Sequence, residues 1–271
     1  MNGKKSLFLD TATQICRQWH SASAREKVNE QLAASKLYCS RYVKCQYKAT
    51  LLDSLIKLHN LSLRSEDFLE AIQKATEGRY SKEAGGKLTT GVLVRVVDIA
   101  YWISRQYETF DEQVGRLRDL IEDGWEILFE DGLELPLIDE TACVYAEGDP
   151  EIGDSGLYKP IRISCSKDKP SVCGIQQFWD NHGIQMEALA KMDINAIEAE
   201  LKDAKELQSV KEHAQAITQN DSPHGKRCTV FLSDAIICIE AMHCPEPVAV
   251  HSINRKHFSP LGEILGIECK P

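Results

Sequence analysis

The stretch from Ser233 to Ile267 constrains the fold more than any other part of the chain, because it joins an apolar helical run to a short strand and a polar turn. The apolar residues that follow Asp234 predict a buried helix, and the helix dipole favours an acidic residue near the helix N-terminus. A Cys-Pro-Glu-Pro segment at 244–247 breaks this helix, and the apolar run 248–250 is typical of a buried parallel strand. Because ligands bind at the carboxyl ends of parallel strands, the polar residues at 251–254 predict a functional site.

The beginning of the chain predicts the other half of this site. Leu7, Phe8 and Leu9 form a short apolar run that ends in Asp10. This pattern is expected of a central strand that delivers a carboxylate to the edge of a parallel sheet. The alternative is that Asp10 only caps the helix that begins near Ala12, since aspartate is a favoured N-cap residue.

Asp10 and Asp234 lie far apart in the sequence, but an α/β fold can bring both carboxylates to one edge of the sheet. Hard oxygen ligands of this kind prefer Mg²⁺ or Mn²⁺, and such ions activate water and stabilise in-line displacement at a phosphodiester. Asn254 is expected to supply a third oxygen, directly or through water. We therefore predict a divalent-metal site that contains Asp10, Asp234 and Asn254.

The composition is compatible with such a site. With 43% hydrophobic residues, the 271-residue chain is expected to form one large α/β domain or one domain with a sizeable insertion. A net charge of -9 argues against a simple basic surface for nucleic acid, although contact through metal ions needs little positive charge. The apolar runs are too short for a membrane span or a signal peptide, so we expect a cytoplasmic protein without membrane contact.

The middle of the chain is predicted to be mainly helical. Apolar residues at helical spacing and helix-forming composition predict helices within 21–36, 37–62, 65–76, 89–106, 110–128 and 175–217. Ten cysteines without a secretory signal favour reduced, buried thiols. A structural zinc site is the alternative, although the compact Cys-x-x-Cys spacing of zinc ribbons is missing. The cysteines considered for it are Cys143, Cys165, Cys173 and Cys228.

Four short segments near the two ends of the chain carry a family resemblance. They are Phe-Leu-Asp-Thr at 8–11 and the segments 40–52, 233–241 and 251–258. In this order they resemble the PIN-domain nucleases, a family that includes toxin subunits of bacterial toxin and antitoxin pairs and is similar to flap endonucleases. The resemblance implies a three-layer α/β/α sandwich with a parallel sheet of about four to five strands. Because the helical middle exceeds a minimal PIN domain, the resemblance also implies a single PIN-like domain over 1–271 with 60–225 as a mostly helical insertion or elaboration. It also implies that Asp10 and Asp234 are the metal carboxylates and that Asn254 follows the last core strand.

One position departs from the family pattern. Gln46 stands where PIN-domain nucleases commonly have a glutamate, and an amide supplies an oxygen without negative charge. Metal affinity and base strength are therefore expected to fall, with Gln46 acting as a neutral ligand or positioning a water. The acidic residues considered as substitutes are poorly spaced for this role, and they are Asp53, Glu66, Glu70 and Glu240.

Further residues near these motifs are candidates for supporting roles. One group is expected either to hydrogen-bond the carboxylates or only to cap turns. Its members are Thr11, Ser40 and Ser252. A second group is basic and is expected to contact nucleic-acid phosphate, with an ordinary solvated surface as the alternative. Its members are Lys44, Arg255, Lys256 and His257.

Together, the residues and the resemblance predict a divalent-metal-dependent endoribonuclease, acting as a toxin or a defence effector, with Mg²⁺ or Mn²⁺ as cofactor. Gln46 motivates an alternative, which is a catalytically degenerate PIN-like module that binds RNA or protein. A DNA-directed nuclease is a third hypothesis, because the sequence does not separate RNA from single-stranded DNA as substrate. The expected partners are the nucleic acid, an antitoxin or defence-system subunit, and a second copy of the chain in a homodimer.

Overall fold

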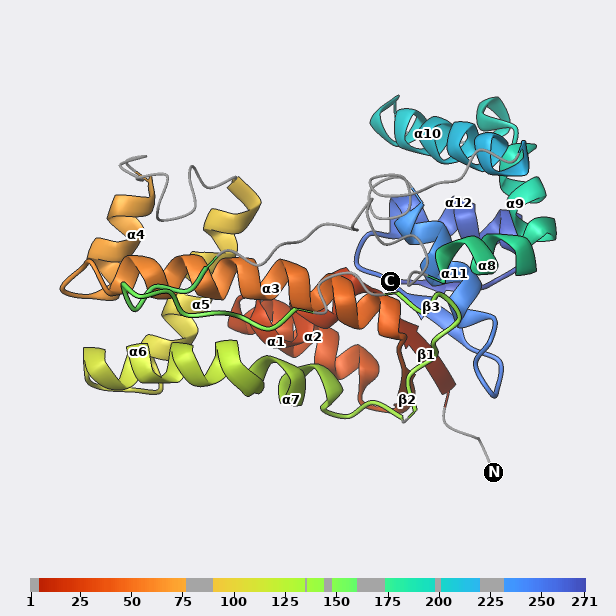
Figure 1. Cartoon of the computed structure of the whole chain (residues 1–271). Coiled ribbons are helices and arrows are strands. Elements are labelled where there is room, and N and C mark those ends of the chain that lie inside the picture. Colours follow the sequence, from red (N-terminus) through yellow and green to blue (C-terminus); the bar gives the residue numbers. More distant parts are fainter. Residues whose placement is uncertain are drawn as a thin grey trace.

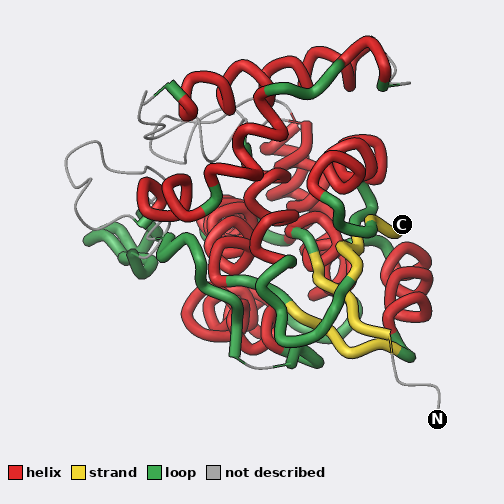
Figure 2. The backbone as a smooth tube through the Cα atoms, turned by 90° about the vertical axis from the view of Figure 1, so that its right-hand side faces the viewer, coloured by secondary structure: helices red, strands yellow, loops and turns green. Residues whose placement is uncertain are grey.

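A parallel sheet organises the fold. The computed structural model describes residues 5–76, 90–134, 136–143, 148–159, 174–197, 201–219 and 232–271. Its sheet, whose strands are yellow in Figure 2, has four parallel strands in the order β2-β1-β3-β4. The strands are β1 (Lys5–Leu9), β2 (Ser35–Tyr38), β3 (Ala249–His251) and β4 (Cys269–Lys270). The prediction of an α/β fold with a parallel sheet of this size is confirmed.

Helices account for most of the remaining described residues. Those nearest to the strands in sequence are α1 (Thr11–Trp19), α2 (Ala22–Leu32), α3 (Arg41–Ser62), α11 (Ser233–Ala241) and α12 (Arg255–Leu265). Between α3 and α11 come α4 (Phe68–Thr76), α5 (Thr90–Ser104), α6 (Phe110–Asp119), the π-helical turn Leu120–Gly124, α7 (Trp125–Glu130), α8 (Ile175–Asn181), α9 (Gly183–Ala190), a short 3-10 turn Ile194–Ala196, and α10 (Leu201–Thr218). Helices α4, α5 and α6 lie toward the end of α3 that is remote from the strands (Figure 1).

The side chains of β1 alternate between two hydrophobic clusters. Leu7 and Leu9 pack in a small cluster with Val28 and Leu32 of α2. Phe8 belongs to the large core, which includes residues of α3, α11 and α12. This separation follows from the two-residue period of a strand, which sends successive side chains to opposite faces. The central strand is therefore covered by apolar side chains on both faces, as in parallel sheets generally.

The long helix α3 forms the middle of the large core. It packs against α1, α4, α5, α6 and α7. Its residues Leu51, Leu52 and Leu55 are completely buried. A helix that is apolar around much of its circumference is stable only when other helices surround it. The helices α4 to α7 supply that surrounding, so they are packed parts of the core and not an appendage to it.

Strand β2 corrects the predicted helix boundaries. Residues 35–38 lie within two segments for which spacing and composition predict helices, but they pair with β1 from Lys5↔Ser35 to Phe8↔Tyr38. Pairing with a buried neighbour outweighs local helix propensity here. The helix α3 begins only after Ser40, whose hydroxyl accepts a hydrogen bond from the Val43 N–H at 3.2 Å and caps the helix.

The chain after α7 runs beside the outer edge of β2. Leu133 pairs with Leu37, and Ile138 pairs with Ser40, as isolated parallel bridges. The backbone N–H of Arg41 also donates to the Ile138 carbonyl at 2.8 Å. These contacts fix residues 139–143 near the start of α3. None of the helices in the described ranges is both long and apolar enough to cross a lipid bilayer.

Candidate active site at the carboxyl edge of the sheet

Asp10 lies directly after β1 and is almost completely buried, with 2% of its surface exposed. Its Oδ1 accepts a hydrogen bond from the Thr13 N–H at 2.7 Å, so Asp10 is the N-cap of α1. Its Oδ2 accepts a hydrogen bond from the Ser252 hydroxyl at 2.7 Å. Because Ser252 follows β3, the carboxylate is held between the ends of two adjacent parallel strands.

The environment of Asp10 opposes its negative charge. Burial raises the pKa of Asp10 to about 6, and the hydrogen bonds from Thr13 and Ser252 act in the opposite direction. The charge of Asp234 raises the pKa further. An electrostatic interaction therefore links the two carboxylates. A cation near both groups would favour the ionised form of each.

Asp234 lies in the first turn of α11 and lines a cleft of about 460 Å³. Glu206 of α10, Asn254 and His257 line the same cleft. His257 lies between the two carboxylates, because its Nδ1 is 3.4 Å from Asp234 Oδ2 and its Nε2 is 2.5 Å from Glu206 Oε2. Sequence reasoning missed Glu206, which sits in a highly charged helix and has no local signal that separates it from other surface acids.

Asn254 is the residue that precedes α12, and its side chain is exposed. Its backbone N–H donates a hydrogen bond to Ser252 Oγ at 2.9 Å, and its side-chain Nδ2 lies 2.9 Å from His257 Nδ1. Ser252 therefore accepts a bond from Asn254 while it donates one to Asp10. This pair of bonds couples the start of α12 to the buried carboxylate.

Gln46 of α3 lies beside the same strand end. The Thr11 hydroxyl donates a hydrogen bond to Gln46 Oε1 at 2.6 Å, and the Gln46 amide donates to the Tyr42 hydroxyl at 3.1 Å. Since Thr11 follows Asp10 directly, the helix position expected to carry a family glutamate is next to the predicted site. Both polar ends of the Gln46 side chain are already engaged with protein groups. If Gln46 bound a metal, its Oε1 atom would have to use the lone pair that does not accept the Thr11 hydrogen bond.

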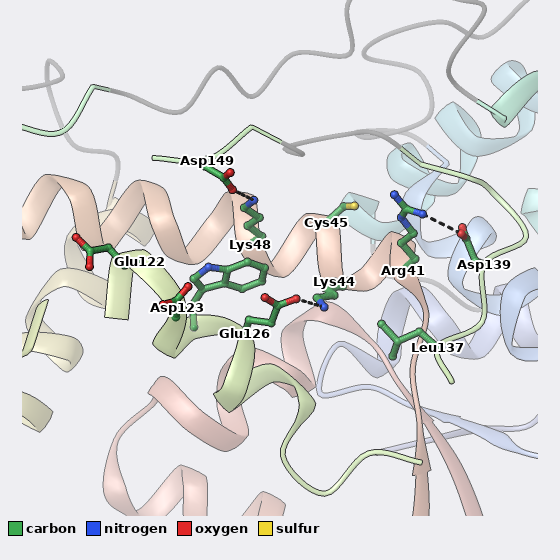
Figure 3. Close-up of a pocket in the computed structure, with 11 residues that line it drawn as sticks. Arg41, Lys44, Cys45, Lys48, Glu122, Asp123, Glu126, Leu137, Asp139 and Asp149 are labelled. Carbon is green, nitrogen blue, oxygen red and sulfur yellow. Dashed lines mark hydrogen bonds and ion pairs between the residues drawn. The ribbon is translucent and has the colours of Figure 1, made fainter. Parts of the chain in front are cut away.

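Lys44 lies on a different side of α3 and faces another cleft, of about 470 Å³ (Figure 3). It forms ion pairs with Glu126 and, at 2.7 Å, with Glu130. In the same cleft, Lys48 Nζ lies 5.2 Å from the centre of the Trp125 ring. The structure therefore does not bring Lys44 to the Asp10 edge, and phosphate contact there would require both of its ion pairs to break.

Arg255 and Lys256 form the first turn of α12, and both side chains are exposed. They directly follow Asn254, which lines the cleft with Asp234. Their position next to the acidic cleft keeps phosphate contact as a prediction for these two residues.

Ser40 and Glu240 form a separate buried group near the start of α3. Glu240 is completely buried on α11, and its Oε1 accepts a hydrogen bond from the Thr141 hydroxyl at 3.1 Å. Burial raises the pKa of Glu240 to about 8, although hydrogen bonds from Ser40 and Thr141 oppose the shift. The Glu240 carboxyl is thus bound by Ser40 and Thr141 beside the end of β2, whereas the Gln46 side chain is bound by Thr11 and Tyr42.

The described part of the chain holds one group of three His, Cys, Asp or Glu residues that is close enough for a single ion, and this group contains neither Asp10 nor Asp234. An ion at the acidic pair would therefore depend on neutral oxygens such as that of Asn254. Among the cysteines considered for zinc, Cys143 is buried and forms no disulfide. The other three, Cys165, Cys173 and Cys228, lie outside the described residues.

Comparisons with known proteins do not assign a family. No family model matches the chain, and neither a curated protein nor a solved structure matches it. The α/β fold with its parallel sheet is compatible with a PIN-like fold. A functional conclusion must therefore come from the site itself.

Proposed function

We propose that this protein is a PIN-like, divalent-metal-dependent endoribonuclease whose sheet is the middle layer of an α/β/α sandwich. The observation that carries the proposal is the placement of Asp10. A buried carboxylate at the carboxyl end of the central strand accepts hydrogen bonds from α1 and from the end of β3. Asp234 is near enough to raise its pKa. This is the position at which open parallel sheets bind ligands.

The donor set fits Mg²⁺ or Mn²⁺. Both ions prefer oxygen ligands and keep several waters, so two carboxylates and a neutral oxygen are a sufficient protein contribution. Asp10, Asp234 and Asn254 are the residues proposed to hold the ion. The unfavourable charge between Asp10 and Asp234 supports this assignment, because a cation would remove it.

A few groups of the chain have specific parts in the proposed reaction. A bound ion supplies an activated water and stabilises charge at the phosphodiester. The Thr13 N–H and the Ser252 hydroxyl orient the Asp10 carboxylate. His257 would pair with Asp234 across the 3.4 Å contact when its ring is protonated. The exposed cations of α12 are proposed to hold the phosphate of the substrate.

A second candidate function has its own observation. Gln46 is neutral, and both ends of its side chain bond to Thr11 and Tyr42. This favours a catalytically degenerate module that binds RNA or a protein partner without cleavage. A nuclease directed at single-stranded DNA would use the same residues as the ribonuclease, so substrate choice must be measured directly.

The test is incubation of the purified protein with labelled RNA and with labelled single-stranded DNA, in the presence of Mg²⁺, Mn²⁺ or a chelator. We expect cleavage of RNA that requires the metal and is lost in Asp10→Asn and in Asp234→Asn. Asp111→Asn is the matched control, because Asp111 is an exposed acid on α6. Circular dichroism of each variant checks that it is folded. RNA cleavage by folded Asp10→Asn at the wild-type rate would refute the proposed site, and binding of RNA without cleavage would favour the degenerate module.

A further inference from the structure

A second group of possible ligands lies at the opposite end of α11 from Asp234. His243 follows the C-terminus of α11, Glu140 lies in the segment beside β2, and His182 forms the corner between α8 and α9. One ligand atom from each residue lies within 4.8 Å of the other two. His243 Nδ1 is 3.7 Å from Glu140 Oε1, and the rings of His182 and His243 have centroids 4.9 Å apart.

His182 provides an independent indication of a ligand. It is 5% exposed, and its Nε2 atom is buried without a hydrogen-bond partner. Buried polar atoms are almost always satisfied, and one that is not requires an explanation such as an ion. The His182 ring also packs at an interplanar angle of 71° against the ring of His243, which places a second imidazole beside the unpaired nitrogen.

We propose that Glu140, His182 and His243 form a binding site for a divalent transition metal, with Zn²⁺ as the ion that suits them best. Two imidazoles and one carboxylate are a ligand set that Zn²⁺ uses, and they leave a fourth position for water. Hard ions such as Mg²⁺ prefer all-oxygen sites, so this group differs in metal preference from the Asp10 and Asp234 pair.

The geometry needs only a small adjustment to accept the ion. Tetrahedral ligands about 2.1 Å from zinc lie roughly 3.4 Å from one another. The ligand atoms of Glu140, His182 and His243 would therefore have to move slightly closer together. The side chains of His243 and Glu140 are 37% and 36% exposed, so both can rotate toward the more buried His182. The ion would connect three segments that are distant in sequence, and its binding should therefore stabilise the folded chain.

The test uses the full chain, freed of metal by a chelator and then dialysed. Titration with Zn²⁺ is followed by calorimetry, and the melting temperature is measured with and without Zn²⁺. We expect one tight site and a higher melting temperature with the metal. Replacement of the exposed ligands, in His243→Ala and Glu140→Gln, should weaken Zn²⁺ binding by about tenfold or more, since loss even of a supporting group has effects of that size.

Two control variants separate this site from other sources of binding. His20→Ala removes an exposed histidine at the C-terminal end of α1 and should leave the affinity unchanged. Asp234→Asn should also leave it unchanged, which makes the result independent of the proposed nuclease site. The chain has ten cysteines, so Co²⁺ is used as a spectroscopic substitute, and histidine and carboxylate ligation should give no strong thiolate band. Unchanged Zn²⁺ affinity in both His243→Ala and Glu140→Gln would overturn the proposal and identify the group as an aromatic packing cluster only.

Discussion

Glu240 should make the stability of this protein depend on pH in a direction opposite to that of most carboxylates. The residue is completely buried, its Oε2 atom has no hydrogen-bond partner, and burial raises its pKa from 4.5 to about 8. Asp139 adds to the shift, while the hydroxyls of Ser40 and Thr141 reduce it. In the folded protein the neutral acid is therefore the main form at pH 7.

The direction in which the free energy of unfolding changes with pH follows from proton linkage. Below pH 4.5 the carboxyl is protonated in the folded and in the unfolded chain, so it adds no pH dependence. Between pH 4.5 and 8 the unfolded chain releases this proton while the folded chain keeps it, and the free energy of unfolding falls as pH rises. At roughly 1.4 kcal/mol per unit, the loss at pH 7 is about 3 kcal/mol.

The perturbation is Glu240→Gln, which keeps the shape of the side chain and the acceptor for Thr141 but cannot ionise. Urea denaturation of both proteins at pH 5, 6, 7 and 8 gives the free energy of unfolding at each pH. We expect the variant to be close to wild type near pH 5 and more stable by about 3 kcal/mol at pH 7. The difference between two proteins cancels the titration of all other groups.

Glu263→Gln is the matched control, since it removes the same charge from an exposed position on α12 and should change stability by less than about 0.5 kcal/mol. A Glu240→Gln difference that stays constant from pH 5 to 8 would show that Glu240 is ionised in the folded protein and that its pKa is not raised. A variant that becomes less stable than wild type as pH rises would contradict the raised pKa as well.

The remaining predictions concern the candidate site and the core. Gln46→Glu should restore the carboxylate of the PIN-domain pattern beside Asp10 and should tighten Mn²⁺ binding, as measured by calorimetry. An unchanged affinity for Mn²⁺ would show that residue 46 does not contact the metal. Ser252→Ala removes the donor to Asp10 Oδ2 and should lower the free energy of unfolding by about 1–3 kcal/mol, measured in urea at pH 7. Leu52→Ala empties a completely buried position on α3 and should cost about 2–5 kcal/mol, whereas Leu69→Ala, at a position 75% exposed, should cost far less in the same assay.

Local patterns were sufficient to locate several elements. The apolar run that ends at Asp10 is β1, and the apolar residues after Asp234 form α11. These two elements are buried on most sides, so their sequences are apolar enough to be recognised without knowledge of their neighbours. By contrast, β2 and β4 are short and contain lysines, and only their pairing with β1 and β3 makes them strands.

Local sequence patterns were enough to predict the α/β class of the fold and to mark Asp10 and Asp234 as candidate site residues, because an acid beside an apolar run is visible without any knowledge of tertiary contacts. The tertiary structure decided which groups surround them. Ser252 bonds to Asp10 although the two residues are 242 positions apart in the sequence. Glu206 contacts His257 from a helix whose sequence is typical of an exposed surface helix. It also placed Glu140, His182 and His243 together, although no spacing in the chain relates them. Such contacts depend on how helices and strands pack. The sequence pattern of one element does not specify which residues of other elements will pack against it.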